Sequence, residues 1–106
     1  MQLKTSIQNG KLTLRLIGEL DHHAAKTSMR KIGEAIDLHL PRDCVMDLSA
    51  LTFMDSSGIA VVLNTHKRMT EIGGRSCVIN VLRQPMKVLT ASGVYRMVEI
   101  QEVAAS

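Results

Sequence analysis

Aromatic side chains are almost missing from this sequence. It has one Phe, one Tyr and no Trp among 106 residues. This scarcity leaves no platform for stacking nucleic-acid bases and no aromatic cage for a cationic ligand. The net charge is +3, but the basic residues are spread along the chain rather than clustered. Composition therefore argues against direct binding of nucleic acid.

Cysteines and long apolar runs are also scarce. Cys44 and Cys77 lie far apart, each within an apolar stretch and outside any CxxC pair. This placement predicts two buried thiols in a reducing compartment rather than a disulfide or a metal site. No apolar run approaches the ~20 residues that span a bilayer. No signal-peptide pattern opens the chain, so we expect a cytoplasmic protein.

The residues that are present suffice for one aliphatic core. Hydrophobic residues make up 45% of the chain, charged residues 22%, and seven Met join Leu, Ile and Val. A chain of this length buries roughly two thirds of its unfolded surface on folding. We therefore expect one domain over residues 1–106.

A hairpin is predicted at the start of the chain. Asn9-Gly10 supplies the two positive φ angles of a type I′ turn between strands at residues 3–8 and 11–17. Gly18 is expected to end the second strand. Apolar residues alternate along that strand and predict its buried face: Leu12, Leu14 and Leu16.

Helical spacing then alternates with short apolar runs. Helices are expected over residues 23–38, from the segment 55–58 to residue 72, and from residue 84 to Gly93, with Pro85 at the first position of the third. The inward-facing residues should be Ala25, Met29, Ile32 and Ile36, then Ile59, Val62, Leu63, His66 and Met69. Further strands are expected at residues 43–48, 76–81 and 96–101. The order ββαβαβαβ predicts an α/β fold, a mixed sheet with an initial hairpin and crossover helices.

One candidate site is Asp55-Ser56-Ser57-Gly58, which lies between a strand and a helix. Asp and Ser side chains cap helices by accepting from the free amides of the first turn. A hydroxyl at a helix N-terminus also lies in positive potential, where an added phosphate is favoured. The residues alone leave capping and phosphorylation both open.

A second candidate site is Glu19-Leu20-Asp21-His22-His23, before the first helix. Capping by Asp21 explains it most simply. A zinc site would need a distant ligand such as His39 or His66, and adjacent His residues share no helix face.

A serine hydrolase is a further alternative, with Asp21, a neighbouring histidine and Ser56 as its triad. The chain lacks the G-x-S-x-G elbow. The sequence therefore predicts a protein that is not an enzyme.

The two segments together resemble the marked motifs of STAS domains that act as anti-anti-sigma factors. Residues 53–59 (FMDSSGI) resemble one motif, and residues 18–23 (GELDHH) resemble the other. The combination is most similar to the sporulation branch, the antagonists of the anti-sigma F factor. The resemblance covers nearly the whole chain.

This resemblance implies a phosphorylation-switched binding module. The unphosphorylated form would bind an anti-sigma factor that is also a serine kinase, and so free a sigma factor. Ser56 would be the phosphoacceptor, and Asp55, Ser57 and Gly58 would shape its loop. Asp21 would lie beside the loop on the partner-facing surface.

The same resemblance implies that a serine phosphatase reverses the modification, and any membrane contact would come through that phosphatase. Nucleotide and Mg²⁺ would belong to the kinase, so this chain would carry no cofactor. The alternative within the fold is a STAS regulatory subunit of another system, either general-stress partner switching or transport. Ser56 argues against it, because such relatives often lack a phosphorylatable serine there.

Overall fold

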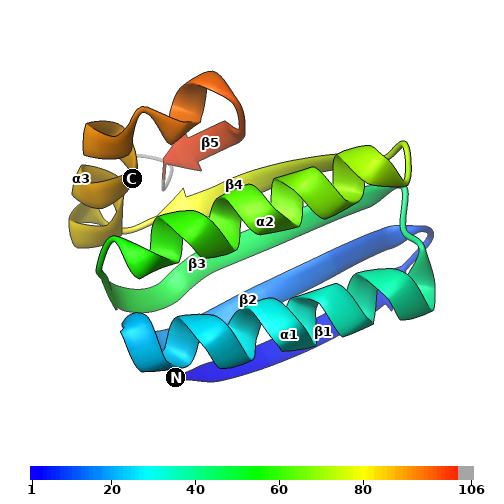
Figure 1. The fold of residues 1–106 in the computed structure, drawn as a ribbon, viewed down its shortest axis with the longest axis horizontal. Coiled ribbons are helices and arrows are strands. Elements are labelled where there is room, and N and C mark those ends of the chain that lie inside the picture. Colours follow the sequence, from blue (N-terminus) through cyan, green and yellow to red (C-terminus); the bar gives the residue numbers. More distant parts are fainter. Residues whose placement is uncertain (103–106) are drawn as a thin grey trace.

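A five-stranded mixed sheet forms the frame of residues 1–102, the part of the chain that the computed structural model describes (Figure 1). The strand order follows the sequence, β1-β2-β3-β4-β5. The elements are β1 (Gln2–Gln8), β2 (Lys11–Leu20), α1 (His22–His39), β3 (Asp43–Met54), α2 (Ser57–Glu71), β4 (Arg75–Val81), α3 (Arg83–Ser92), a 3₁₀ turn (Val94–Arg96) and β5 (Glu99–Glu102). The predicted order of strands and helices is confirmed, with the 3₁₀ turn added.

The opening hairpin forms at the predicted turn. Asn9 and Gly10 have φ angles of 53° and 78°, which a type I′ turn requires. β1 and β2 pair antiparallel, whereas β2-β3, β3-β4 and β4-β5 pair parallel. The predicted α/β class and mixed sheet are therefore confirmed.

The helices α1 and α2 lie side by side across one face of the sheet (Figure 1). Their buried apolar residues belong to one core cluster with the alternating leucines of β2, which are fully buried as predicted: Leu12, Leu14 and Leu16. No helix in residues 1–102 is long and apolar enough to cross a membrane.

Two strands are longer than the sequence predicted. β2 continues through Gly18 to Leu20, and β3 continues to Met54. Gly18 has a φ of +103°, and the pairing with β3 shifts register beside it. Gly18 therefore forms a bulge at which the strand bends and continues, whereas the sequence predicts that the strand ends there.

The buried faces of the helices are rotated slightly from the predicted stripes. In α2, Val61 and Thr65 are buried, whereas Ile59, Leu63 and His66 are only half-buried. Thr65 can be buried because its hydroxyl donates to the Val61 carbonyl oxygen at 2.8 Å. The predicted stripe did not include Thr65, because helical spacing alone does not show that a hydroxyl can be satisfied within its own helix.

In α1 the predicted inward-facing stripe is confirmed, but it missed two positions. Met29 is half-buried and packs against the core, and the buried stripe also includes Ser28 and Gly33. The Ser28 hydroxyl donates to the Ala24 carbonyl oxygen at 2.7 Å, which satisfies it inside the protein.

Two boundaries near the end of the chain also differ from prediction. α3 begins at Arg83, so Pro85 is its third residue rather than its first. This position is still within the first turn, where the missing N–H of proline costs no helical hydrogen bond. The last strand begins at Glu99 rather than residue 96, because Val94–Arg96 forms the 3₁₀ turn.

The two cysteines are free thiols in different environments. Cys44 is fully buried, and Cys77 is half-buried, so the prediction of two buried thiols holds for Cys44 alone. Burial raises the pKa of the Cys44 thiol to about 12 and also raises the pKa of Cys77. Both thiols are therefore protonated and poorly nucleophilic at neutral pH.

Candidate phosphorylation and partner-binding site

The two candidate segments lie together at one end of the sheet. α1 and α2 begin at this end, where the parallel strands β2 and β3 finish (Figure 1). The Asp55 amide donates to the Leu20 carbonyl oxygen at 3.2 Å. This bond joins the residue before Ser56 to the residue before Asp21.

Ser56 is exposed at the N-cap position of α2. Its backbone has helical angles, φ −61° and ψ −21°, and its side chain makes no cap hydrogen bond. Ser57 is the first residue of the helix and is half-buried. Of the two adjacent hydroxyls, that of Ser56 is the more accessible to another protein.

Asp55 caps α2, although the sequence allowed either an Asp or a Ser side chain of this segment to do so. Its Oδ1 atom accepts from the Ser57 amide at 2.8 Å. Its carbonyl oxygen accepts from the Gly58 amide at 3.0 Å. One aspartate therefore satisfies the first amides of α2, which leaves the Ser56 hydroxyl outside the cap.

Gly58 allows α2 to start directly against β3. A Cβ atom at Gly58 would lie 2.3 Å from Cγ of Met54. Met54 is fully buried, so its side chain has little room to move away. Glycine at this position therefore sets how closely the serine loop approaches the core.

Asp21 caps α1 from the end of β2. Its Oδ1 atom accepts from the Ala24 amide at 2.9 Å. This hydrogen bond is the main cause of a lowered Asp21 pKa, and the charge of His23 lowers it further. The carboxylate is half-buried and is held ionised at the same end of the sheet as the serine loop.

An open hollow of about 640 Å³ lies next to Asp21, between the start of β1 and α1. Glu19, His23 and Lys31 contribute charged or polar groups to its lining. This end of the molecule thus offers a contoured surface with both signs of charge.

Sequence reasoning missed one residue of this end of the sheet. Gln84, in the first turn of α3, binds both polar groups of Met54: its Oε1 accepts from the Met54 amide at 2.8 Å, and its Nε2 donates to the Met54 carbonyl at 2.9 Å. The two residues are 30 positions apart in the chain, and no local pattern marks such a contact.

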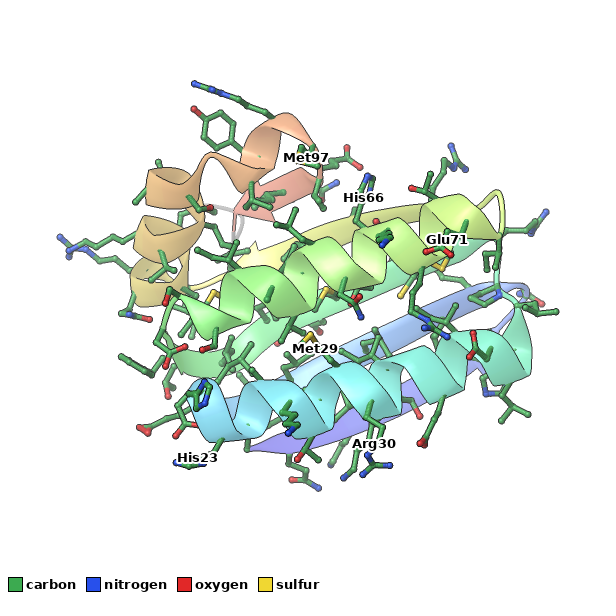
Figure 2. The ribbon with its side chains drawn as sticks, viewed as in Figure 1. His23, Met29, Arg30, His66, Glu71 and Met97 are labelled. Carbon is green, nitrogen blue, oxygen red and sulfur yellow. The ribbon has the colours of Figure 1, made fainter. Side chains whose placement is uncertain are left out.

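The histidines do not form one cluster. His22 and His23 stand edge to face at the start of α1 with ring centroids 5.8 Å apart. His66 lies on α2 and contacts the Ser76 hydroxyl at 3.1 Å, well away from His23 (Figure 2). Within residues 1–102, no three His, Cys, Asp or Glu residues are grouped to hold a metal ion.

The fold and the exposed loop define a small α/β module whose candidate site lies on its surface. The STAS domain family matches residues 2–106, and the chain belongs to this family.

Relatives of known role support this assignment. The chain is 33% identical over 102 residues to the anti-sigma F factor antagonist of Paenibacillus polymyxa, covering 96% of this chain and 87% of the relative. It superposes on the unphosphorylated anti-sigma factor antagonist SpoIIAA with a TM-score of 0.81 at 29% identity, covering 93% of this chain and 87% of the other. The phosphorylated form of the Bacillus cell fate determinant SpoIIAA gives a TM-score of 0.72, also at 29% identity, over 93% and 90% of the two chains.

Proposed function

We propose that this chain is an anti-sigma factor antagonist of the sporulation type, switched off by phosphorylation of Ser56. Its unphosphorylated form binds an anti-sigma factor that is also a serine kinase, and so frees a sigma factor. The kinase then modifies Ser56, and a serine phosphatase restores the hydroxyl. The observation that carries the proposal is the exposed Ser56 hydroxyl outside the cap of α2. Its relatives support the role, because SpoIIAA is an anti-sigma factor antagonist with a phosphorylated form.

In this proposal each site residue has a separate task. Ser56 accepts the phosphate. Asp55 and Gly58 fix the loop through the Ser57 amide bond and the close contact with Met54. Ser57 and Asp21 complete the surface that meets the partner. The nucleotide and Mg²⁺ arrive with the kinase, so no cofactor is assigned to this chain.

Charge explains how one phosphate could end the interaction without refolding the domain. Phosphoserine adds roughly −1.5 to −2 charges at neutral pH. At position 56 the N-terminus of α2 stabilises this negative charge by about 0.3–1 kcal/mol. The Asp55 and Asp21 carboxylates repel it. These effects nearly cancel within the free protein. In the complex, the dianion has to lose its water against a surface shaped for a hydroxyl, which costs several kcal/mol.

The test uses the full chain, a candidate anti-sigma factor kinase, ATP and Mg²⁺. We expect one phosphate per chain, mapped to Ser56 by mass spectrometry. The phosphorylated chain should bind the kinase more than about a hundredfold more weakly, a loss of about 3 kcal/mol. Amide NMR shifts between the two forms should be confined to the Ser56 loop and its neighbours.

Two outcomes would contradict the proposal. A chain that neither binds the kinase nor accepts phosphate would favour a STAS subunit of another system. Shifts spread across all strands and helices would show that phosphate remodels the domain rather than the interface.

A further inference from the structure

Within residues 1–102, the end of β3 has a neighbouring strand on one side only. On one side, β2 pairs with β3 as far as Leu20 opposite Met54. On the other side, the pairing with β4 stops at Asp47 opposite Ile79. The part of β3 that follows Asp47 therefore has no pairing with β4, and its backbone groups on that side need other partners.

Gln84 supplies these partners at the point nearest the serine loop. Its carboxamide donates to the Met54 carbonyl at 2.9 Å and accepts from the Met54 amide at 2.8 Å. The pair of bonds imitates a strand neighbour, with α3 in place of β4. Met54 is thus bound by Gln84 on one side, while the next amide, that of Asp55, is bound to Leu20 on the other.

We propose that Gln84 is a positioning residue for the phosphorylation of Ser56. The proposal rests on the proposed function, since it assigns Gln84 a role in that same reaction. Gln84 touches no reacting group and acts through Met54. The Met54 side chain lies against Gly58, so a shift of Met54 moves the start of α2 together with the loop that presents Ser56.

The packing around Met54 explains why two hydrogen bonds can matter this much. Met54 is fully buried, and a polar group that loses its partner away from water is costly. Without Gln84, the end of β3 gains by moving towards water. A displacement of about 1 Å at a reacting group can lower a rate by about a hundredfold.

Gln84→Met is the sharpest variant for a test. Methionine has nearly the same length and helix propensity as glutamine, but it cannot donate to the Met54 carbonyl, and its thioether is only a weak acceptor for the Met54 amide. Gln84→Glu keeps an acceptor for the Met54 amide and loses the donor to the carbonyl. Arg68→Ala is the matched control: it removes the ion pair with Asp37 between α1 and α2, in the last turn of α2 and away from the loop.

Two measurements on the full chain separate the proposed function from the role of Gln84. The first is amide hydrogen exchange of Met54, Asp55 and Ser57, which needs no partner. The second is kcat/KM for phosphate incorporation at Ser56 by the kinase. For Gln84→Met we expect exchange at Met54 to be at least about tenfold faster. We expect kcat/KM to fall by about ten- to a hundredfold, with Gln84→Glu between this variant and the unmodified chain.

The control defines what a purely structural role would look like. Arg68→Ala should lower the melting temperature but leave loop exchange and kcat/KM unchanged. If Gln84→Met behaves in the same way, Gln84 only stabilises the fold and the inference is overturned. If the unmodified chain accepts no phosphate, the proposed function fails. Hydrogen exchange tests Gln84 without the kinase. If exchange of the Met54 and Asp55 amides is unchanged in Gln84→Met, Gln84 does not hold the loop, and its proposed role fails whatever the result for phosphorylation.

Discussion

The Asp55 amide donates to the Leu20 carbonyl oxygen at 3.2 Å, and this bond joins the two halves of the candidate site. Leu20 is the last residue of β2, and Asp55 is the first after β3. The bond continues the parallel pairing of these strands to the point where β2 leads into α1 and β3 leads into α2. Asp21 and Ser56, which follow Leu20 and Asp55 in the sequence, therefore lie at the same end of the sheet.

Ser56→Ala should abolish phosphate incorporation and leave the melting temperature almost unchanged. A kinase needs the hydroxyl as its nucleophile, but the Ser56 side chain makes no cap hydrogen bond that folding would lose. Binding to the unphosphorylated form's partner should persist. Mass spectrometry and thermal melting would check this. Ser57→Ala is the matched control and should still accept phosphate on Ser56. Phosphate found on Ser57 of the Ser56→Ala variant would move the assignment by one residue.

Asp21→Ala should weaken binding to the kinase more than it weakens the fold. Asp21 lies at the same end of the sheet as the serine loop, which is joined to the preceding residue, Leu20, by the Asp55 amide. This is the end where the partner is proposed to bind. Removal of one helix cap should lower the melting temperature by several degrees, too little to unfold the domain. Titration with the kinase and a melting curve on the same sample test this prediction. Unchanged binding with a large fall in melting temperature would reduce Asp21 to a structural cap.

The stabilising effect of Asp21 should disappear in acid. The Ala24 amide favours the ionised carboxylate and lowers its pKa in the folded protein below the usual 3.8. A group with a lowered folded pKa stabilises the protein fully above its unfolded value and loses that effect as pH falls through the folded value. The difference in melting temperature between the unmodified chain and Asp21→Ala should therefore shrink below about pH 4. A difference that is constant from pH 7 to pH 3 would contradict this account.

Gly58→Ala should destabilise the protein by about 1–3 kcal/mol. The added methyl group would lie 2.3 Å from Cγ of the buried Met54, and β3 or α2 would have to shift. Gly33→Ala is the control, because the atoms nearest to its methyl group would belong to the flexible Arg68 side chain, at 3.3 Å. Denaturant unfolding of both variants measures the difference. An equal or larger loss for Gly33→Ala would show that the contact with Met54 is not the constraint.

Local patterns were sufficient to predict the class of fold. Asn9-Gly10 permits one tight turn with the right twist, and the alternating leucines of β2 permit one buried face. The capping role of Asp21 was also predictable, because a capping bond joins residues three positions apart. In each case the interacting groups are close in the sequence, so their chemistry is visible in a short window.

Strand ends were less predictable, because they depend on neighbours that the local sequence does not show. Gly18 and the segment from Ser49 to Met54 extend their strands because β2 and β3 pair with each other along this stretch. The burial of Thr65 likewise depends on a hydrogen bond to the preceding turn of α2. A pattern of apolar residues contains neither the pairing nor the bond.

The sequence by itself determined the α/β order, the aliphatic core and the two segments that carry the candidate site. Only the tertiary structure decided that the Asp55 amide binds Leu20, and that Gln84 holds the end of β3. The physical reason is range. Helix and turn preferences arise between residues a few positions apart, whereas the contacts between Leu20 and Asp55 and between Met54 and Gln84 join residues more than 25 positions apart, once packing has placed the elements.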